Sequence, residues 1–208
     1  ALSNGDYGVV AGSWDAPGSV QDAGAFTLCD GGTGCAGAIS ALTSLVGSQP
    51  GDTIGANGNE SPEVAGPFEL ASGAVVVRSP RWDSGATADV GAVTPCGSPA
   101  TCSGVVGAAN SVIGAGANDR TGEVHCCLDD LGDDSFVVET RNWDAPGPVP
   151  DVGAVTWCVD GACLGPVTAD SSVVGSNTGF MRPDYDPNHD QVVVGRGADN
   201  ILTLLRRE

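Results

Sequence analysis

One motif occurs three times along the chain: Trp-Asp, a short turn, and then Asp-x-Gly-Ala-hydrophobic-Thr. The copies begin at Trp14, Trp82 and Trp143, so the steps between them are 68 and 61 residues. Each copy follows an apolar run of β type and precedes a second signature, Ser-x-Val-Gly or Ser-x-Ile-Gly, at residues 44–47, 111–114 and 172–175. A period of this size indicates supersecondary units that bury their faces only against one another. The chain is therefore predicted to be a repeat protein.

Turn-forming residues divide the chain into short segments. The sequence has 32 Gly and 13 Pro among 208 residues, and short Val, Ile, Thr and Leu runs lie between them. No window carries a sustained apolar period of 3.6 residues, and none approaches the roughly 18 apolar residues of a membrane span. We predict an all-β protein without a membrane span.

One repeat can be divided into four short strands. These are the apolar run before Trp-Asp, the Gly-Ala-x-Thr segment, a strand after a Cys-bracketed hairpin, and the Ser-x-Val-Gly segment. A repeat of about 60 residues with four antiparallel strands is typical of a β-propeller blade. The tail repeats the first two strands, which gives about 3.5 repeats in one continuous domain. The predicted boundaries are 1–56, 57–123, 124–183 and a half repeat at 184–208.

The tryptophans have two predicted roles. Trp14, Trp82 and Trp143 recur at one place in the repeat, so we expect them to pack between blades or between a blade and a loop. Trp157 has Leu28 and Pro95 at the corresponding positions. It is therefore the better candidate for an exposed aromatic side chain.

The charge is strongly acidic. The chain has 26 acids and 8 bases, all of them Arg, for a formal net charge of −18. Such a surface repels phosphate backbones, so we expect no nucleic-acid partner. It attracts cations and suits a saline or calcium-containing exterior, although genomic base composition alone would also explain the lack of Lys.

Six of the eight cysteines form pairs at one place in the repeat, just after the Gly-Ala-x-Thr segment. The pairs are Cys29/Cys35, Cys96/Cys102 and Cys158/Cys163. Each brackets a turn-rich tetra- or pentapeptide, which brings the two Cα atoms into bridging range. Zinc sites normally use closer pairs that converge with a second pair, whereas these lie a whole repeat apart. We predict three hairpin disulfides and hence a secreted or cell-surface protein.

Two cysteines remain. Cys126 and Cys127 are adjacent to His125. They would form a strained vicinal disulfide, a bridge to another chain, or a Cys-Cys-His metal site that lacks a fourth ligand. The sequence leaves these alternatives open. It shows no signal-peptide pattern and begins inside a repeat, so we expect a mature or trimmed product.

Several segments resemble a known repeat. Residues 193–198 read Val-Val-Gly-Arg-Gly-Ala, residues 24–27 read Gly-Ala-Phe-Thr, and residues 51–55 read Gly-Asp-Thr-Ile-Gly. This pattern resembles the FG-GAP repeat, the blade unit of integrin α-type seven-bladed propellers and of many large secreted bacterial proteins. The chain departs from it in a broken Gly-Ala-Pro and in Ile in place of Phe. Trp-Asp repeats of long bacterial surface proteins fit equally well.

The resemblance implies calcium binding in an Asp-rich loop. Its fourth copy here offers Asp184, Asp186, Asn188 and Asp190 at alternating positions, which are oxygen ligands suited to a hard cation. The third copy offers Asp130 and Asp134. The family's closing acid corresponds to Val192, and alternating Asp is also typical of a solvated turn. The resemblance therefore predicts Ca²⁺ first at the fourth loop.

Catalytic patterns are weak. His125 and His189 lie in unrelated repeats, and neither belongs to a Ser/His/Asp or His-x-x-His arrangement. No spacing singles out a carboxylate pair for glycoside hydrolysis, so a hydrolase is the least favoured class. We expect a non-enzymatic extracellular module for adhesion or for recognition of a protein or glycan.

The alternative is a structural subunit of an extracellular filament or surface assembly. A count of about 3.5 repeats leaves strands without partners. The terminal strands are therefore predicted to pair with another copy or with the rest of a longer chain. A compact four-bladed monomer, whose two termini pair with each other, is the competing arrangement.

Overall fold

The computed structural model describes residues 1–56, 67–123, 131–161 and 163–206. The described residues are all-β apart from one short 3-10 helix. The first repeat holds β1 (Tyr7–Ala11), β2 (Ala25–Cys29) and β3 (Leu45–Val46). The second holds β4 (Phe68–Glu69), β5 (Val75–Ser79), β6 (Ala92–Cys96), β7 (Gly104–Val105) and β8 (Val112–Ile113). The third holds β9 (Phe136–Thr140), β10 (Ala154–Cys158), β11 (Gly165–Pro166) and β12 (Val173–Val174). A final sheet holds β13 (Met181–Asp186), β14 (Gln191–Arg196) and β15 (Ile201–Arg206), with the 3-10 helix η1 (Gly197–Asp199) before β15.

Each repeat builds the same antiparallel sheet. The orders β1-β2-β3, β5-β6-β8 and β9-β10-β12 correspond strand for strand. The register is also the same, because Ala11 lies opposite Ala25, Ser79 opposite Ala92, and Thr140 opposite Ala154. This confirms the predicted first, second and fourth strands and the all-β repeat.

The third strand differs from the prediction of four antiparallel strands per repeat. β7 pairs in parallel with β3 of the preceding repeat, and β11 pairs in parallel with β8. The N–H groups of Gly104 and Val106 donate to the carbonyls of Ser44 and Val46, both at 3.0 Å. Gly104 and Gly165 have φ of 120° and 91°, a region that favours glycine. This conformation directs the chain after the second and third Cys-closed hairpins towards the preceding repeat.

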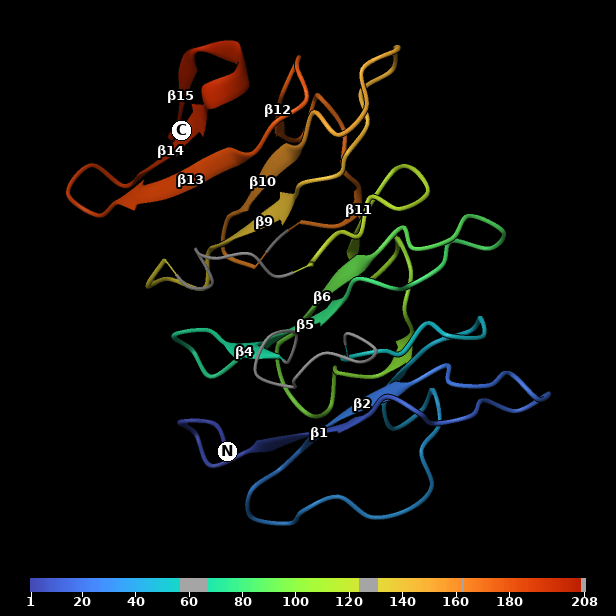
Figure 1. Cartoon of the computed structure of the whole chain (residues 1–208). Coiled ribbons are helices and arrows are strands. Elements are labelled where there is room, and N and C mark those ends of the chain that lie inside the picture. Colours follow the sequence, from blue (N-terminus) through green and yellow to red (C-terminus); the bar gives the residue numbers. More distant parts are fainter. Residues whose placement is uncertain (57–66, 124–130, 162, 207–208) are drawn as a thin grey trace.

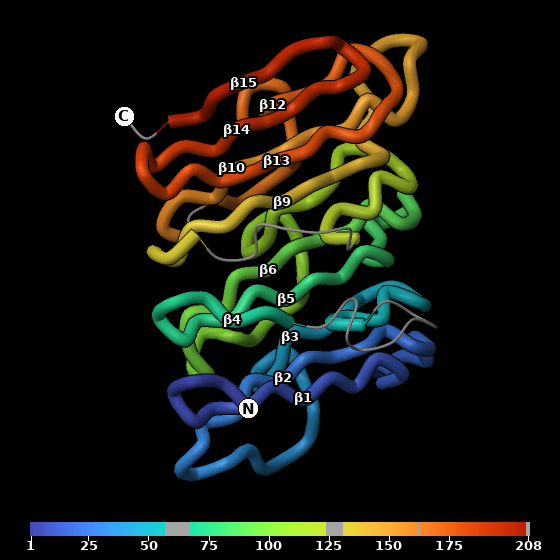
Figure 2. Tube along the Cα trace, turned by 60° about the vertical axis from the view of Figure 1, so that its left-hand side comes forward, coloured from blue at the N-terminus to red at the C-terminus, as the bar shows by residue number. Residues whose placement is uncertain are grey.

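The repeats follow one another along one direction, with the two chain ends at opposite ends of the stack (Figures 1 and 2). Within the described residues, no sheet closes on itself, so a propeller ring is not confirmed. Over the same residues β1 pairs only with β2, and β15 only with β14. The compact alternative with paired termini is therefore not the arrangement of this structure.

The apolar core consists of three clusters, each between successive units. The first joins Phe26 and Leu45 of the first repeat to Val77 and Trp82 of the second. The second joins the second and third repeats around Trp143, and the third joins the third repeat to the final sheet. Trp82 and Trp143 thus pack between repeats, as predicted, whereas Trp14 is half-buried and belongs to none of the three clusters. The prediction for Trp157 is wrong, because its side chain is half-buried against the third cluster.

The Trp-Asp motif fixes a loop. In each copy the carboxylate after the Trp accepts a hydrogen bond from the N–H of the second Asp, at 2.7–2.8 Å (Asp15 and Asp22, Asp83 and Asp89, Asp144 and Asp151). The second Asp and the following Gly both have positive φ. The motif therefore specifies a backbone shape, since short polar residues and Gly tolerate this conformation best.

The two repeated signatures are joined by a hydroxyl pair. The Thr that ends Gly-Ala-x-Thr and the Ser that begins Ser-x-Val-Gly lie 2.6–2.7 Å apart in all three repeats (Thr27 and Ser44, Thr94 and Ser111, Thr156 and Ser172). A hydroxyl that loses water on burial needs a partner. This explains why both signatures carry a hydroxyl residue. Among the described residues, no helix is long and apolar enough to cross a membrane.

Candidate functional site

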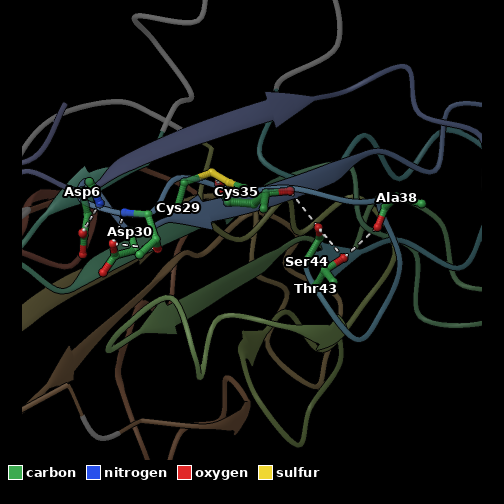
Figure 3. The surroundings of a disulfide bond; sticks show 10 residues. Asp6, Cys29, Asp30, Cys35, Ala38, Thr43 and Ser44 are labelled. Carbon is green, nitrogen blue, oxygen red and sulfur yellow. Dashed lines mark hydrogen bonds between the residues drawn. A yellow bond between two sulfur atoms is a disulfide. The ribbon is translucent and has the colours of Figure 1, made fainter.

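The cysteine pairs lie in equivalent hairpins. Disulfides join Cys29 to Cys35, Cys96 to Cys102 and Cys158 to Cys163, as predicted, with Cα–Cα distances of 5.1, 4.8 and 5.1 Å. In the first hairpin, the Asp30 carboxylate accepts from the N–H groups of Gly32 and Thr33, and the Thr33 bond lowers the pKa of Asp30 (Figure 3). Three such pairs are consistent with an extracellular location. His125, Cys126 and Cys127 lie outside the described residues.

Two carboxylates predicted as calcium ligands in the fourth loop accept hydrogen bonds within their own hairpin. The Asp186 carboxylate accepts from the backbone N–H of Asn188, and its second oxygen lies 2.6 Å from Nδ1 of His189. His189 holds the pKa of Asp186 below its usual value. Asp190 accepts the hydroxyl of Tyr185 at 2.9 Å, which raises the pKa of Tyr185. These oxygens are occupied by donors of the β13–β14 hairpin.

Asp184 and Asp134 of the third loop also accept hydrogen bonds from backbone N–H groups. Asp184 lies on β13 and accepts the backbone N–H of Tyr185 at 2.9 Å. Asp134 accepts the N–H of Ser72, from the preceding repeat, at 2.9 Å, whereas Asp130 lies outside the described residues. Over the parts of the chain that the structure describes, no three acidic, His or Cys side chains gather to hold a metal. Calcium binding at these loops therefore stays a prediction.

Two buried carboxylates escaped the sequence predictions as a pair. Asp52 and Asp119 are essentially fully buried, and burial raises the pKa of both. Asp52 accepts the N–H groups of Ser48 and Gln49 and, from the next repeat, that of Asp83 at 2.8 Å. Each lies five residues after the Gly of the second signature, a spacing that would have revealed them. Their bonds are to backbone donors, which indicates a role in joining repeats.

A groove lies where the third repeat meets the final sheet. It has a volume of about 530 Å³. Side chains of β9, β13 and the segments beside them line it (Glu139, Arg141, Phe180, Met181, Arg182, Pro183 and Asp184). Two of the chain's eight Arg residues thus face one apolar hollow, in a protein of net charge −18.

One of the two cations in the groove, Arg141, is held in place. Nε of Arg141 lies 2.9 Å from the Glu139 carboxylate, and the Arg141 guanidinium lies 5.0 Å from the centre of the Phe180 ring. Burial raises the pKa of Glu139, against the opposing effect of Arg141 and Arg182. Phe180 is 68% exposed, so one face of the ring remains available. The arrangement can bind a ligand that combines an anionic group with a flat apolar surface.

Sequence reasoning missed this groove. The backbone N–H of Gly179 donates to the carbonyl of Asp151. In the first two repeats, the N–H groups of Thr53 and Arg120 make the corresponding bonds to the carbonyls of Asp22 and Asp89. The next residues in the first two repeats, Ile54 and Thr121, are buried, whereas Phe180 is exposed. Counted from the Gly of the second signature, this position comes two residues sooner in the third repeat than in the first two. This shortened turn followed by Phe is the sequence feature that could have indicated the groove.

Comparison with known families gives one match. The model of a repeat of unknown function (DUF5650) matches residues 1–56, 69–123 and 130–181. No curated protein matches the chain. The family description names neither FG-GAP nor integrin-type repeats, so that resemblance stays a prediction. Three matched copies cover most of the sequence and coincide with the three structural repeats. The chain belongs to the family of DUF5650 repeat proteins.

Proposed function

We propose that this chain is an extracellular recognition module that binds an acidic glycan in the groove between the third repeat and the final sheet, without catalysis. The observation that carries the proposal is the Arg141 guanidinium held by Glu139 and stacked on the exposed ring of Phe180. A sugar ring has apolar C–H faces that stack on an aromatic ring, and a uronate carboxylate is a natural partner of Arg.

Arg182 supplies the second cation. Its side chain is exposed and lines the groove beside Pro183, and it acts on Glu139 electrostatically. Arg141 is already paired with Glu139, so Arg182 is better placed to take the ligand's anionic group. The three disulfide hairpins support a secreted or cell-surface location for such a module.

The test is a titration with an oligogalacturonate, with a neutral oligosaccharide of the same length as the comparison ligand. Binding is followed by calorimetry and by chemical shifts of the Phe180 ring. Arg182→Ala and Phe180→Ala should each weaken binding about tenfold, which corresponds to about 1.4 kcal/mol. The neutral oligosaccharide should bind more weakly than the acidic one.

A charge-matched control is available in the second repeat. Arg120 pairs with Asp89 and Glu123 on the surface, so Arg120→Ala removes one positive charge outside the groove. It should leave binding unchanged. Equal losses of affinity in Arg120→Ala and Arg182→Ala would mean that only the net charge of the protein matters. Chemical shifts of the Phe180 ring that stay unchanged with both ligands would overturn the proposal.

A second candidate function is a structural subunit of an extracellular filament or surface assembly. The observation that favours it is the apolar face left open at each end of the stack (Val9 at one end, Leu202 at the other). The β-propeller architecture and calcium binding stay predictions, and neither is needed for either function.

A further inference from the structure

The two ends of the stack expose surfaces that are buried everywhere inside it. On the N-terminal side, the comparison is set by the strand register. Val9, Val77, Val138 and Val194 each lie opposite the Thr of their repeat (Thr27, Thr94, Thr156 and Thr203). Val77, Val138 and Val194 pack against the preceding unit and are 0–3% exposed, whereas Val9 is 44% exposed. Tyr7 is 37% exposed, and its counterpart Val75 only 1%.

The strand edge beside Val9 is also open. Gly37 follows the disulfide hairpin as Gly104 and Gly165 do, and all three have positive φ. Gly104 and Gly165 start the strands that pair with the preceding repeat. Among the described residues, the N–H groups of Gly37 and Ile39 have no such backbone partner. The edge is thus already shaped for pairing.

A groove of about 450 Å³ runs between this edge and β1. Its lining contains Thr27 and no charged residue. It also contains Ser44 and the Cys29–Cys35 bridge (Figure 3). The corresponding space beneath the second repeat is filled by Phe26, Leu28 and Leu45 of the first. The N-terminal groove therefore has the shape and chemistry of an unfilled contact between repeats.

The C-terminal end carries the matching surface. The same register places Leu202 at the position of Phe26 and Leu204 at that of Leu28. Phe26 and Leu28 are 0% and 5% exposed because the second repeat covers them, whereas Leu202 and Leu204 are 75% and 50% exposed. The N-terminal end is the more acidic of the two. Residues 1–56 hold five Asp and no base, whereas residues 182–207 hold four Arg and four Asp.

We propose that a second copy of this chain binds head to tail, with Leu202 and Leu204 of one copy in the N-terminal groove of the next. The contact repeats the internal interface seen between the first and second repeats. Because the joined surfaces differ and lie at opposite ends (Figure 2), the association is heterologous and stays open to further copies. The inference rests on the second candidate function and does not involve the ligand groove.

The experiment is sedimentation velocity of the full chain over a concentration series, with free thiols alkylated so that no disulfide joins copies. The variants are Val9→Asp, which places a charge beside the N-terminal groove, and Leu202→Asp, which places one on the C-terminal end surface. Leu164→Asp is the control, because Leu164 is 59% exposed but lies in the third repeat, away from both end faces. All three side chains are exposed in the single chain, so urea midpoints at low concentration should match the parent chain.

The parent chain and Leu164→Asp should form a series of species whose mass rises with concentration. Val9→Asp and Leu202→Asp should each sediment as monomers. An equimolar mixture of these two should form dimers and nothing larger, because each supplies one intact end. A parent chain that stays monomeric, a mixture that stays monomeric, or association lost in only one end variant would overturn the proposal. Glycan binding through Arg182 and Phe180 can succeed or fail independently of all these outcomes.

Discussion

The carboxylate of Asp199 accepts a hydrogen bond from the backbone N–H of Ser176 at 3.1 Å, although the two residues are 23 positions apart. In the first two repeats the corresponding N–H groups, of Ser48 and Ala115, bind the repeat's own Asp52 and Asp119. The third repeat lacks such an acid, and the final sheet supplies one. Asp199 also binds Asn177 and Arg196, so it ties the final sheet to the stack.

These two kinds of carboxylate should give opposite pH dependences. The Asn177 side chain is the largest influence that lowers the pKa of Asp199. The Asp199 carboxylate therefore stabilises the fold at pH values above the ordinary Asp pKa, about 4. This contribution is lost as the pH falls below that pKa. Burial raises the pKa of Asp52. Its protonated form is favoured in the folded chain, so stability is lost as the pH rises above about 4.

Urea unfolding across this pH range checks both signs. Asp199→Asn should flatten the loss of stability on the acid side, and Asp52→Asn should flatten the loss on the alkaline side. The compared quantity is the slope of the free energy of unfolding against pH, because each substitution also changes hydrogen bonds and so shifts the free energy at every pH. The same slope change in both variants would contradict the opposite shifts.

Gly91→Ala should be much more destabilising than Gly85→Ala. Both glycines lie in one Trp-Asp loop with positive φ, of 76° and 63°, so both substitutions cost roughly 1 kcal/mol in backbone strain. A Cβ at Gly91 would also overlap the backbone of Arg120 and Thr121, whereas Gly85 has open space. The overlap should add about 1–3 kcal/mol. Equal free energies of unfolding for the two variants would refute this close approach.

The buried hydroxyl pair of Thr94 and Ser111 should show strong coupling. Ser111→Ala leaves the buried Thr94 hydroxyl without this partner and should cost about 1–3 kcal/mol. Thr94→Val should cost less, because the Ser111 hydroxyl still donates to Oδ1 of Asn110 at 3.0 Å. The double variant should cost less than the sum of the two. The exposed pair Ser98 and Thr101 serves as the control and should show almost no coupling. Additive losses at Thr94 and Ser111 would show that the hydroxyls act separately.

Removal of one disulfide should weaken the fold without abolishing it. The Cys96–Cys102 bridge spans only six positions. The chain-entropy model gives about 2 kcal/mol for so short a loop. Cys96→Ala with Cys102→Ala should therefore lower the free energy of unfolding by that amount while preserving the circular dichroism spectrum. Complete unfolding of this variant would mean that the hairpins contribute far more than loop closure.

The sequence was informative where a residue acts within its own repeat. The apolar runs, Gly-Ala-x-Thr and the cysteine pairs all form local strands or hairpins, and their period alone places them. The pairing of β7 with β3 was not predictable, because it depends on how one repeat lies on the next. The partners of the Asp-rich turns were not predictable for a similar reason. Asp134 binds Ser72 of another repeat, and spacing within one turn does not reveal a donor in the neighbouring one.

The ligand groove depends on such packing as well. Phe180 follows a turn that is shorter than its two counterparts, and it is exposed in the groove beside the final sheet. Trp157 shows the converse, since its departure from the repeat pattern suggested an exposed side chain. It packs instead against the cluster that the third repeat forms with the final sheet.

The open stack is tested most directly by hydrogen exchange of individual backbone amides, measured by NMR in dilute solution. The amides of Gly104, Val106, Gly165 and Val167 donate across the contacts between repeats at 2.8–3.0 Å and should exchange slowly. Those of Gly37 and Ile39, at the open edge of the first repeat, should exchange quickly under the same conditions. Fast exchange at the first four amides would contradict the stacking of the repeats, and strong protection at Gly37 and Ile39 would indicate a closed ring.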